Sequence, residues 1–325
     1  MKRLLQVTAG AILAAAASTA LAQGIFPGRP VKIVVPFAPG GASDAVARPV
    51  AQAMSAILGQ PVVVENKPGA AGNIALEFVA RAPADGYTLL LGNISTNAMN
   101  QTSYGQTLKI VPSRDLTAVG MIGYTPSVLV ASIQFPPRNG QEFVAYAKAN
   151  PGKVNYWLPG VASGPHFDMV QLEKTAGIRM TAVPFSGGAG QGMTALMGGQ
   201  VDIGLVNLGG ALPQVRGGKL KALAVSTPTR LPELPDVPTA AEAGLGTLTS
   251  SWQGLFVPAA TPKPVLLKLH QAMNEALAKA EIKEALAKSS TILTPSKSPE
   301  DAQGYIVGET TKWARIITDS GIKPE

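Results

Sequence analysis

Short apolar runs alternate along the chain with longer stretches whose apolar positions recur at helical spacing. The first run, at 31–35, is rich in β-branched residues and stops at a proline, so it predicts a buried strand. After a glycine-rich loop, apolar positions from Val46 to Ile57 keep a helical period, and Gly59 ends that helix. Pro49 falls inside the helix and predicts either a later start or a bend.

The same alternation predicts most of the remaining elements. Further strands are expected at 62–65, 87–92, 154–158, 178–185, 201–206, 220–226 and 252–258. Helices are expected at 74–82, 139–150, 167–177, 191–199, 264–288 and 305–321. Strands that alternate with helices in this way are typical of α/β folds built on parallel sheets.

Two consecutive series of strands and helices predict two lobes. The second series begins near residue 153, and the chain is expected to cross between lobes near 119–124 and 220–227. The predicted division is 23–123 with 227–325 for lobe 1, and 124–226 for lobe 2. Two connecting strands between lobes form a hinge.

The N-terminal 22 residues have a short basic start, an alanine-rich apolar core and an Ala20-Leu21-Ala22 ending. This pattern predicts a secretory signal peptide over 1–22, cleaved before Gln23. The apolar core is shorter than the roughly 20 residues that a membrane span needs. No cysteine follows the cleavage position, so we expect no lipid attachment there and predict an exported protein.

Composition narrows the function classes. The chain has no cysteine, so an exported form would contain no disulfide and would depend on a buried core. Its net charge is +7, and loss of Lys2 and Arg3 with the leader leaves 25 basic against 20 acidic residues, or +5. The basic residues are scattered and lack interleaved aromatics, which argues against nucleic-acid binding.

Two glycine-rich loops stand between a predicted strand and a predicted helix, one in each series. They are PFAPGGASD at 36–44 and PGVASGPH at 159–166. Ser43 or Asp44 could cap the helix that follows the first loop. Helix N-termini offer unpaired backbone N–H groups that favour anions, so the loops could hold a carboxylate from both sides. Each loop could also be a plain capped turn.

Catalytic, cofactor and metal-binding signatures are scarce in the sequence. It contains no GxGxxG, GxxxxGK[ST] or GxSxG motif, and two histidines are too few for a metal site with ordinary ligand spacing. We therefore predict no cofactor, no metal and no catalytic residues. The alternative is an exported hydrolase that uses Ser163 as nucleophile and His166 as base, with a third group that the sequence does not supply.

The chain resembles the receptors of tripartite tricarboxylate transporters, also called Bug receptors, over essentially all of the exported region. The resemblance rests on PFAPGGASDAVAR, PVVVENKPGAAGNIALEFVARAPADGYTLLLG, VNYWLPGVASGPHF, VPFSGGAGQGMTALMGGQVDIGL and LPQVRGGKLKALAVSTPTRLPELPDVPTAAEAG. It implies a two-lobed periplasmic binding protein of the Venus-flytrap type, a monomer that closes on a small organic carboxylate. It also implies delivery to a membrane permease of two subunits.

The resemblance implies that loops of both lobes grip the ligand carboxylates. The residues carried over are Phe37, Ala38, Gly41, Ser43, Asp44, Ser95, Thr96, Asn97, Gly160, Ala162, Ser163, His166, Phe185, Ser186 and Asn207. Val206 stands where family members usually carry an aspartate, which favours a ligand without an amine, such as a dicarboxylate or an aromatic acid, over an amino acid. Trp157 also departs from the small polar residues common there, and it could be core or a wall of the cleft.

The segments VPFAPGG at 35–41 and VPFSGG at 183–188 look like copies, but they follow different strands of the two series. If the lobes are superimposed, the first segment corresponds to the loop PGVASGPH and the second to the loop ENKPGAAG. Both can end at one cleft, with Phe37 and Phe185 on opposite walls. The sequence thus predicts a periplasmic receptor without a catalytic step, although a sensor for a signalling partner would read the same closed state.

Overall fold

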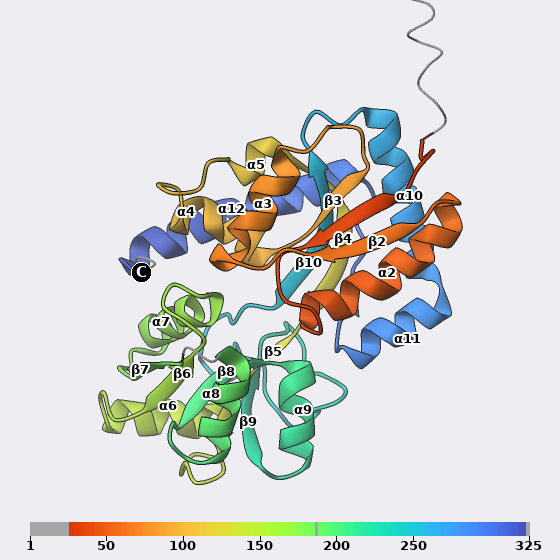
Figure 1. Ribbon diagram of the computed structural model, residues 1–325. Helices are drawn as coiled ribbons and strands as arrows, with labels where there is room; N and C mark the ends of the chain where they lie inside the picture. The colour runs from red at the N-terminus through yellow and green to blue at the C-terminus, as the bar shows by residue number, and fades with distance from the viewer. Residues whose placement is uncertain (1–25, 186–187, 323–325) are drawn as a thin grey trace, which may run out of the picture.

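The computed structural model describes residues 26–185 and 188–322, and it contains two α/β lobes (Figure 1). The predicted signal peptide and Ser186 therefore lie outside the described residues. Within the described part of the chain, no helix is both long and apolar enough to cross a membrane.

The first lobe is built on a six-stranded sheet in the order β11-β4-β10-β3-β1-β2. Its strands are β1 (Val31–Val35), β2 (Val62–Asn66), β3 (Thr88–Asn93), β4 (Leu116–Thr125), β10 (Ser251–Pro258) and β11 (Ile292–Leu293). Its helical segments are α2 (Ala42–Leu58), η1 (Ala70–Gly72), α3 (Asn73–Ala80), η2 (Ser95–Met99), α4 (Asn100–Ser103), α5 (Pro112–Asp115), α10 (Lys263–Ala278), α11 (Ala280–Lys288) and α12 (Pro299–Ser320).

The second lobe is built on a five-stranded sheet in the order β7-β6-β8-β5-β9. Its strands are β5 (Ser127–Ser132), β6 (Asn155–Leu158), β7 (Thr181–Pro184), β8 (Ile203–Asn207) and β9 (Leu220–Val225). Its helices are α6 (Gly140–Ala149), α7 (Gly164–Ala176), α8 (Gly188–Met197) and α9 (Leu208–Arg216).

The two sheets share one arrangement of three neighbouring strands at one edge. In the first, β1 lies between β2 and β3, and in the second β6 lies between β7 and β8. The loop after β1 is therefore the counterpart of the loop after β6, which confirms the predicted pairing of PFAPGG with PGVASGPH. It likewise confirms that VPFSGG, after β7, corresponds to the loop after β2.

Both sheets are mixed, whereas the alternating pattern predicted parallel sheets. Strand β10 runs antiparallel to β3 and β4, and β5 runs antiparallel to β8 and β9. Strands β10 and β5 each belong to a connection between the lobes, whereas the short β11, antiparallel to β4, does not. A strand that enters a sheet from the other lobe meets it from the opposite end, so it cannot continue the parallel series.

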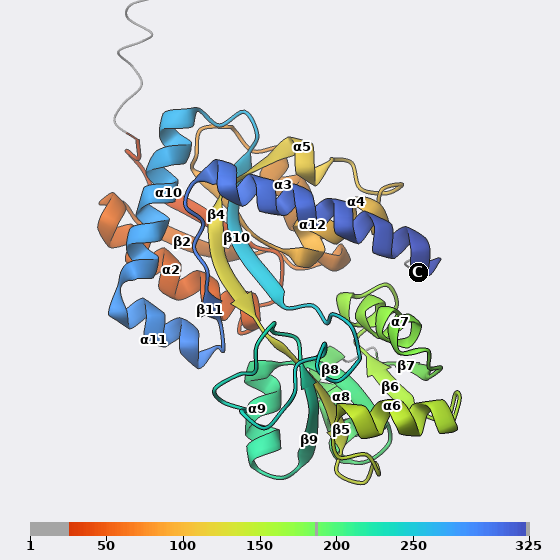
Figure 2. The same cartoon turned by 180° about the vertical axis from the view of Figure 1, so that it is seen from behind.

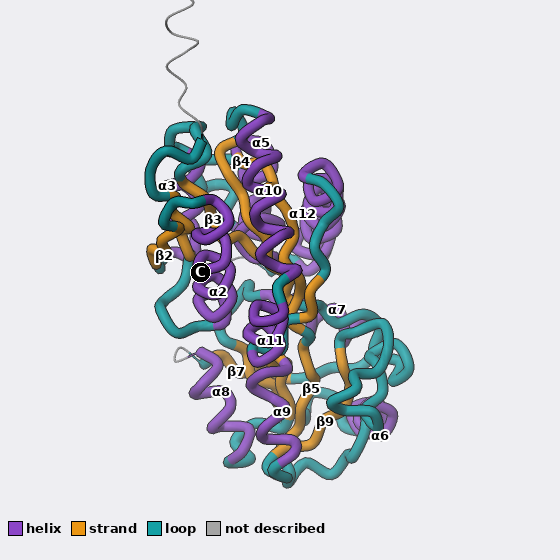
Figure 3. Tube along the Cα trace, turned by 90° about the vertical axis from the view of Figure 1, so that its right-hand side faces the viewer, coloured by secondary structure: helices purple, strands orange, loops and turns teal. Residues whose placement is uncertain are grey.

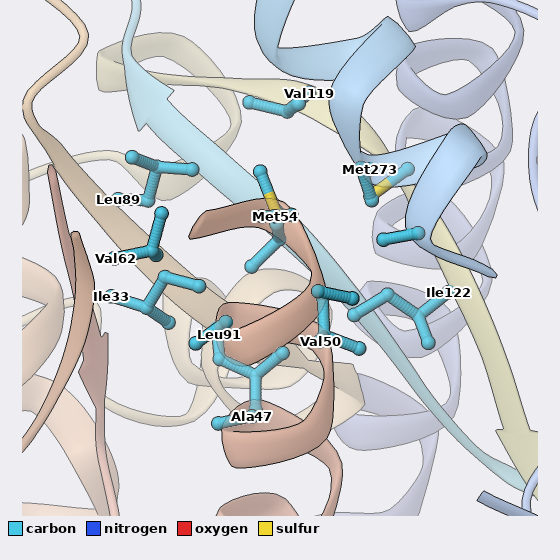
Figure 4. Close-up of a cluster of buried hydrophobic side chains, with 14 of the residues drawn as sticks. Ile33, Ala47, Val50, Met54, Val62, Leu89, Leu91, Val119, Ile122 and Met273 are labelled. Atoms are coloured by element: carbon cyan, nitrogen blue, oxygen red, sulfur yellow. The ribbon is translucent and has the colours of Figure 1, made fainter. Parts of the chain in front are cut away.

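Helices cover both faces of the first sheet. Buried side chains of β1, α2, α10 and α11 form a core on one face (Figure 4), and α3, η2 and α12 form the core on the other. Met54 of α2, Met273 of α10, and Val119 and Ile122 of β4 all belong to the first of these cores. The long α12 crosses the back of this lobe and ends near α7 of the second lobe (Figure 2).

The chain crosses between the lobes twice. Strand β4 passes directly into β5 through Pro126, and the segment after β9 returns to β10. Two hydrogen bonds hold the two crossings together, because Ser226 N donates to the backbone Ser127 O at 2.9 Å and Ser127 N donates to the side-chain Ser226 Oγ at 2.8 Å. The predicted hinge of two connections is therefore present.

The return segment packs with the second lobe before it crosses. Its buried side chains Leu231, Leu234, Ala240, Ala243, Leu245 and Leu248 join the two cores of that lobe. We propose that the second lobe extends to about residue 250 in place of the predicted end at 226. The sequence did not predict this packing, because the segment is rich in proline and glycine and has almost no regular secondary structure that would give a hydrophobic period.

Several elements differ from their predicted form. Helix α2 begins at Ala42 with Gly41 as its N-cap, so Pro49 lies inside it and neither Ser43 nor Asp44 caps it. The predicted helix at 264–288 is two helices, because Lys279 adopts an extended conformation between α10 and α11. The predicted turn after β3 is a π-helical segment, η2. Strand β5 was not predicted at all.

Candidate functional site

A cavity of about 820 Å³, here called the cleft, opens between the two lobes. It is lined by Gly40, Gly41, Ala42, Ala45, Thr125, Trp157, Pro159, Pro165, Gly190, Met193, Leu205, Val206, Asn207, Gly209, Gly210, Ala285, Lys288 and Ser289. These residues come from both sheets' strand-to-helix loops and from α11. Viewed from the side, α2 and α11 of the first lobe face α8 and α9 of the second (Figure 3).

Four helices begin at the cleft. Gly41 caps α2, Pro165 lies in the first turn of α7, Gly190 lies in the first turn of α8, and Asn207 caps α9. All four flank the cavity. The positive ends of four helix dipoles therefore lie around one volume, which favours a bound anion.

The charged side chain of the cleft is basic. Of the described residues that line it, Lys288 at the end of α11 alone carries a charge, and no ion pair joins it to an acid within that part of the chain. The ammonium group adds to the field of the helix N-termini. The sequence did not indicate Lys288, because a single lysine at the end of a helix cannot be distinguished from the other solvent-exposed lysines.

A smaller chamber of about 170 Å³ adjoins the cleft at its hinge end. This hinge chamber is lined by Ile94, Ser95, Met99, Ser127, Gly164, Pro165, Asp168, Leu205, Asn207, Thr249, Ser251 and Trp313. Pro165, Leu205 and Asn207 line both volumes, so the two are neighbours.

The first lobe brings two of its predicted site residues to these cavities. Gly41 lines the cleft and Ser95 lines the hinge chamber. Phe37 is half-buried and Ala38 is exposed, and neither lines the cavities. Thr96 and Asn97 are buried and bond each other, because Thr96 Oγ1 donates a hydrogen bond to Asn97 Oδ1 at 2.7 Å. Ser43 is buried in the first turn of α2.

Asp44 belongs to a hydrogen-bonded network behind the first loop. Its carboxylate accepts from Arg48 Nε at 2.8 Å, from Gly40 N at 3.0 Å and from Asn66 Nδ2 at 3.0 Å. The Arg48 hydrogen bond, with those from Gly40 and Asn66, lowers the pKa of Asp44 to about 2 despite its burial. Asp44 thus fixes the loop that presents Gly40 and Gly41, and we assign it a supporting role.

The second lobe places Asn207 at the junction of the cleft and the hinge chamber. Its other predicted residues lie close by but outside the cavity linings: Gly160, Ala162, Ser163, His166 and Phe185. Ala162 is buried in a core cluster shared with the first lobe, and Phe185 packs against the second sheet.

Ser163 and His166 do not pair with each other. His166 Nδ1 accepts a hydrogen bond from Ala162 N at 3.2 Å, while Ser163 Oγ is buried and has no partner within the described residues. Burial lowers the pKa of His166. This geometry gives the alternative hydrolase no activated nucleophile.

Trp157 combines both roles considered for it. Its side chain is 3 % exposed and belongs to the core of the second lobe, yet it also lines the cleft. Two glycines make room for the indole: a Cβ atom at Gly192 would lie 2.3 Å from its ring, and one at Gly204 would lie 2.0 Å from its Nε1. The ring is thus held in a fixed slot at the floor of the cavity.

Comparison with known proteins identifies the family. Residues 46–322 match the family described as tripartite tricarboxylate transporter family receptor. Protein BugT of Bordetella pertussis (strain Tohama I) is 34 % identical over 327 residues, which cover 99 % of each chain.

Two solved structures share the fold over nearly their whole length. MatC from Rhodopseudomonas palustris, solved with bound malate, has a TM-score of 0.76 and 35 % identity, and the match covers 90 % of this chain and 100 % of MatC. R. palustris Rpa4515, solved with adipate, has a TM-score of 0.80 and 32 % identity over 92 % of this chain and 100 % of Rpa4515. The predicted two-lobed binding-protein fold is thereby confirmed. The chain belongs to the tripartite tricarboxylate transporter receptor family, whose members are periplasmic solute-binding receptors.

Proposed function

We propose that this protein is an extracytoplasmic receptor that binds a small organic carboxylate, either a di- or tricarboxylate or an aromatic acid. The observation that carries the proposal is the cleft itself. Four helix N-termini and Lys288 surround it, and no acid is present among the described residues that line it. A carboxylate placed there gains the field of the helix N-termini and a cation, and it meets no acidic side chain among the described residues of the cleft lining.

The size of the cleft suits such a ligand. Its volume of about 820 Å³ lies within the roughly 300–1,000 Å³ typical of small-molecule sites. The structural relatives solved with malate and with adipate both hold dicarboxylates. Trp157 contributes only a narrow, fixed aromatic edge to the cleft, because its side chain is 3 % exposed.

Closure of the lobes is the conformational step of the proposal. Because the cleft is lined from both lobes, a ligand that bridges them favours the closed state. The closed receptor would then deliver the ligand to a two-subunit membrane permease in the periplasm, after export directed by residues 1–22. This role requires no catalytic step and no cofactor.

Titration calorimetry with the exported form of the chain, residues 23–325, tests the proposal. The panel would contain succinate, malate, adipate, citrate, benzoate and 4-hydroxybenzoate, and at least one should bind and be recovered chemically unchanged. A correctly folded sample that binds no member of the panel would contradict a carboxylate receptor. Turnover that disappears in Ser163→Ala would instead favour the hydrolase.

A matched pair of lysine variants tests the electrostatic part of the proposal. Lys288→Gln should weaken the best ligand roughly tenfold, because loss of a charged hydrogen bond costs about 1.5 kcal/mol. Lys283→Gln removes the same charge from the same helix, α11, outside the cleft lining, and should bind almost as well as the wild type. Equal losses in both variants would assign the effect to overall charge rather than to Lys288.

A further inference from the structure

The two neighbouring cavities have opposite polarity. The cleft is lined by a cation and by helix N-termini, whereas the hinge chamber is lined by the acidic residue Asp168. Asp168 lies in the second turn of α7 and is only 5 % exposed. An ionised carboxyl beside the proposed carboxylate site would repel the ligand, unless a hydrogen-bond donor of the ligand faces it.

No cation neutralises Asp168 within the described residues. Thr249 Oγ1 donates a hydrogen bond to its Oδ1 at 2.7 Å. The nearest basic influence, Lys312 of α12, is already paired with Glu309 at 3.1 Å. Burial raises the pKa of Asp168 to about 7, although the Thr249 hydrogen bond and Lys312 oppose the rise. Asp168 therefore lacks a full counter-charge, and in its ionised form it can accept a further hydrogen bond from a ligand.

We infer that the hinge chamber is a second subsite, in which Asp168 accepts a hydrogen bond from a hydroxyl or ammonium group of the bound acid. The inference rests on the proposed function and narrows it: the ligand is a carboxylate that carries a hydrogen-bond donor. Its carboxylate lies in the cleft, toward the helix N-termini and Lys288, and its donor enters the chamber.

The size and the lining of the chamber agree with this assignment. About 170 Å³ accommodates a hydroxyl or ammonium group with its carbon, since a water molecule occupies about 30 Å³ in the liquid. The other polar side chains of the lining are the hydroxyls of Ser95, Ser127, Thr249 and Ser251, the amide of Asn207 and the indole of Trp313, whose Nε1 is buried and has no hydrogen-bond partner within the described residues. The hydroxyls and the amide can accept as well as donate hydrogen bonds, so they tolerate a neutral or positive substituent, whereas a second carboxylate would face Asp168 directly.

The inference also modifies an argument from the sequence. Val206 lacks the family's customary aspartate, and that absence favoured ligands without an amine. Asp168 supplies a carboxyl at the hinge end of the same cleft, from helix α7 instead of strand β8. A donor-bearing ligand is therefore compatible with the structure.

Calorimetry with matched ligands tests the subsite. Succinate, malate and aspartate share one four-carbon dicarboxylate skeleton and carry hydrogen, hydroxyl and ammonium respectively at the second carbon. Benzoate and 4-hydroxybenzoate provide the same comparison on an aromatic skeleton. Each would be titrated into the wild type, Asp168→Asn and Glu173→Gln, the last of which neutralises another carboxyl of α7 that lines neither cavity.

The wild type should prefer a donor-bearing acid over its unsubstituted partner by about tenfold or more. Asp168→Asn should reduce that preference to about twofold or less while retaining carboxylate binding, and Glu173→Gln should retain the preference. Malate ahead of aspartate would identify a hydroxyl subsite, and the reverse order an ammonium subsite. Thermal melts would establish that each variant is folded.

Two results would overturn the inference and leave the proposed function intact. One is a wild type that binds the unsubstituted acids at least as tightly as their donor-bearing partners. The other is a folded Asp168→Asn variant whose preference is unchanged. Failure of the wild type to bind any carboxylate would reject both the proposed function and the subsite.

Discussion

Two buried aspartates show how strongly the surroundings of a single residue decide its role. Asp44 and Asp168 each lie near the start of a helix, and each carboxyl is about 5 % exposed. Arg48, Gly40 and Asn66 donate hydrogen bonds to Asp44 and lower its pKa, whereas burial without a paired cation raises the pKa of Asp168. The first therefore stabilises the fold, and the second is available to a ligand.

Asp44→Asn should destabilise the protein at neutral pH by about 2 kcal/mol, the equivalent of its pKa depression from 3.8 to about 2. The folded pKa is below the unfolded value, so this stabilisation is present above about pH 4 and is lost as the pH falls toward 2. Thermal melts of the wild type and the variant from pH 7 to pH 2.5 measure the difference. A constant gap between their melting temperatures over that range would refute the assignment.

Asp168→Asn should have the opposite pH dependence. The folded pKa of about 7 exceeds the unfolded value of 3.8, so the unfolded chain releases this proton first as the pH rises. The stability of the wild type should fall between about pH 4 and pH 7, by up to about 4 kcal/mol, with Lys312 and Glu309 as the charged neighbours. The variant should gain stability relative to the wild type over this interval in denaturant titrations at pH 4.5 and pH 8.

At the level of secondary-structure elements, helix α8 and strand β8 each place a glycine against the ring of Trp157. Gly192 and Gly204 stand against opposite parts of the indole, at positions where any side chain would overlap it. Glycine at these positions is explained by close approach alone, since neither has a positive φ. The slot fixes the floor of the cleft, because a close-packed aromatic ring cannot shift without moving α8.

Gly192→Ala should therefore destabilise the second lobe by about 1–3 kcal/mol through overpacking against Trp157. Gly190→Ala lies in the same helix with no heavy atom within 4 Å of the new methyl group, and it should be neutral or stabilising by up to about 1 kcal/mol. Urea titrations of both variants give the comparison. Adding Trp157→Phe to Gly192→Ala should recover part of the loss, and no recovery would argue against the overlap.

At the scale of the whole molecule, the lobes are joined by the hinge on one side and touch again across the cleft. Helix α9 begins beside the loop that follows α11, where a Cβ atom at Gly209 would lie 3.8 Å from the Cβ of Ser290. That separation is the mean Cβ–Cβ distance of a disulfide. The chain contains no cysteine, so a pair introduced there would have no competing thiol.

The double variant Gly209→Cys and Ser290→Cys should form a disulfide under mild oxidation and hold the lobes together. Stopped-flow binding of whichever carboxylate the calorimetric panel identifies should then become much slower, because entry requires the lobes to separate. A reductant should restore the wild-type rate, and each single-cysteine variant should be insensitive to it. Unchanged binding rates in the confirmed disulfide form would show that the ligand enters without opening of the cleft.

The hydrophobic pattern was sufficient to predict most of the helices and strands, and to predict that the loops after β1 and β6 correspond to each other. Periodicity reports burial along one segment, and each of those segments is buried by its own lobe. It failed where burial comes from distant segments. Strand β5 follows β4 after only one residue, and the stretch at 231–248 buries its leucines in the second lobe without a repeating pattern.

The residues of the candidate site also fall into those that the sequence predicted and those that it did not. The sequence indicated the two glycine-rich loops and, by resemblance, Gly41, Ser95 and Asn207, which do reach the cavities. It did not indicate Lys288, and it gave no reason to separate Asp168 from other helical acids. Both are placed by the approach of the two lobes, which depends on how α11 and α7 pack and not on local spacing.

The two-series α/β organisation, the family and the helix N-termini after two glycine-rich loops can all be predicted from the order of the residues, because local composition and periodicity encode them. Which groups share a cavity depends on the folded arrangement of the two lobes. It sets Lys288 at the cleft, buries Asp168 at the hinge end and assigns Asp44 to a supporting network. The physical reason is that charge, burial and hydrogen bonding act through space, whereas residue order specifies only neighbours along the chain.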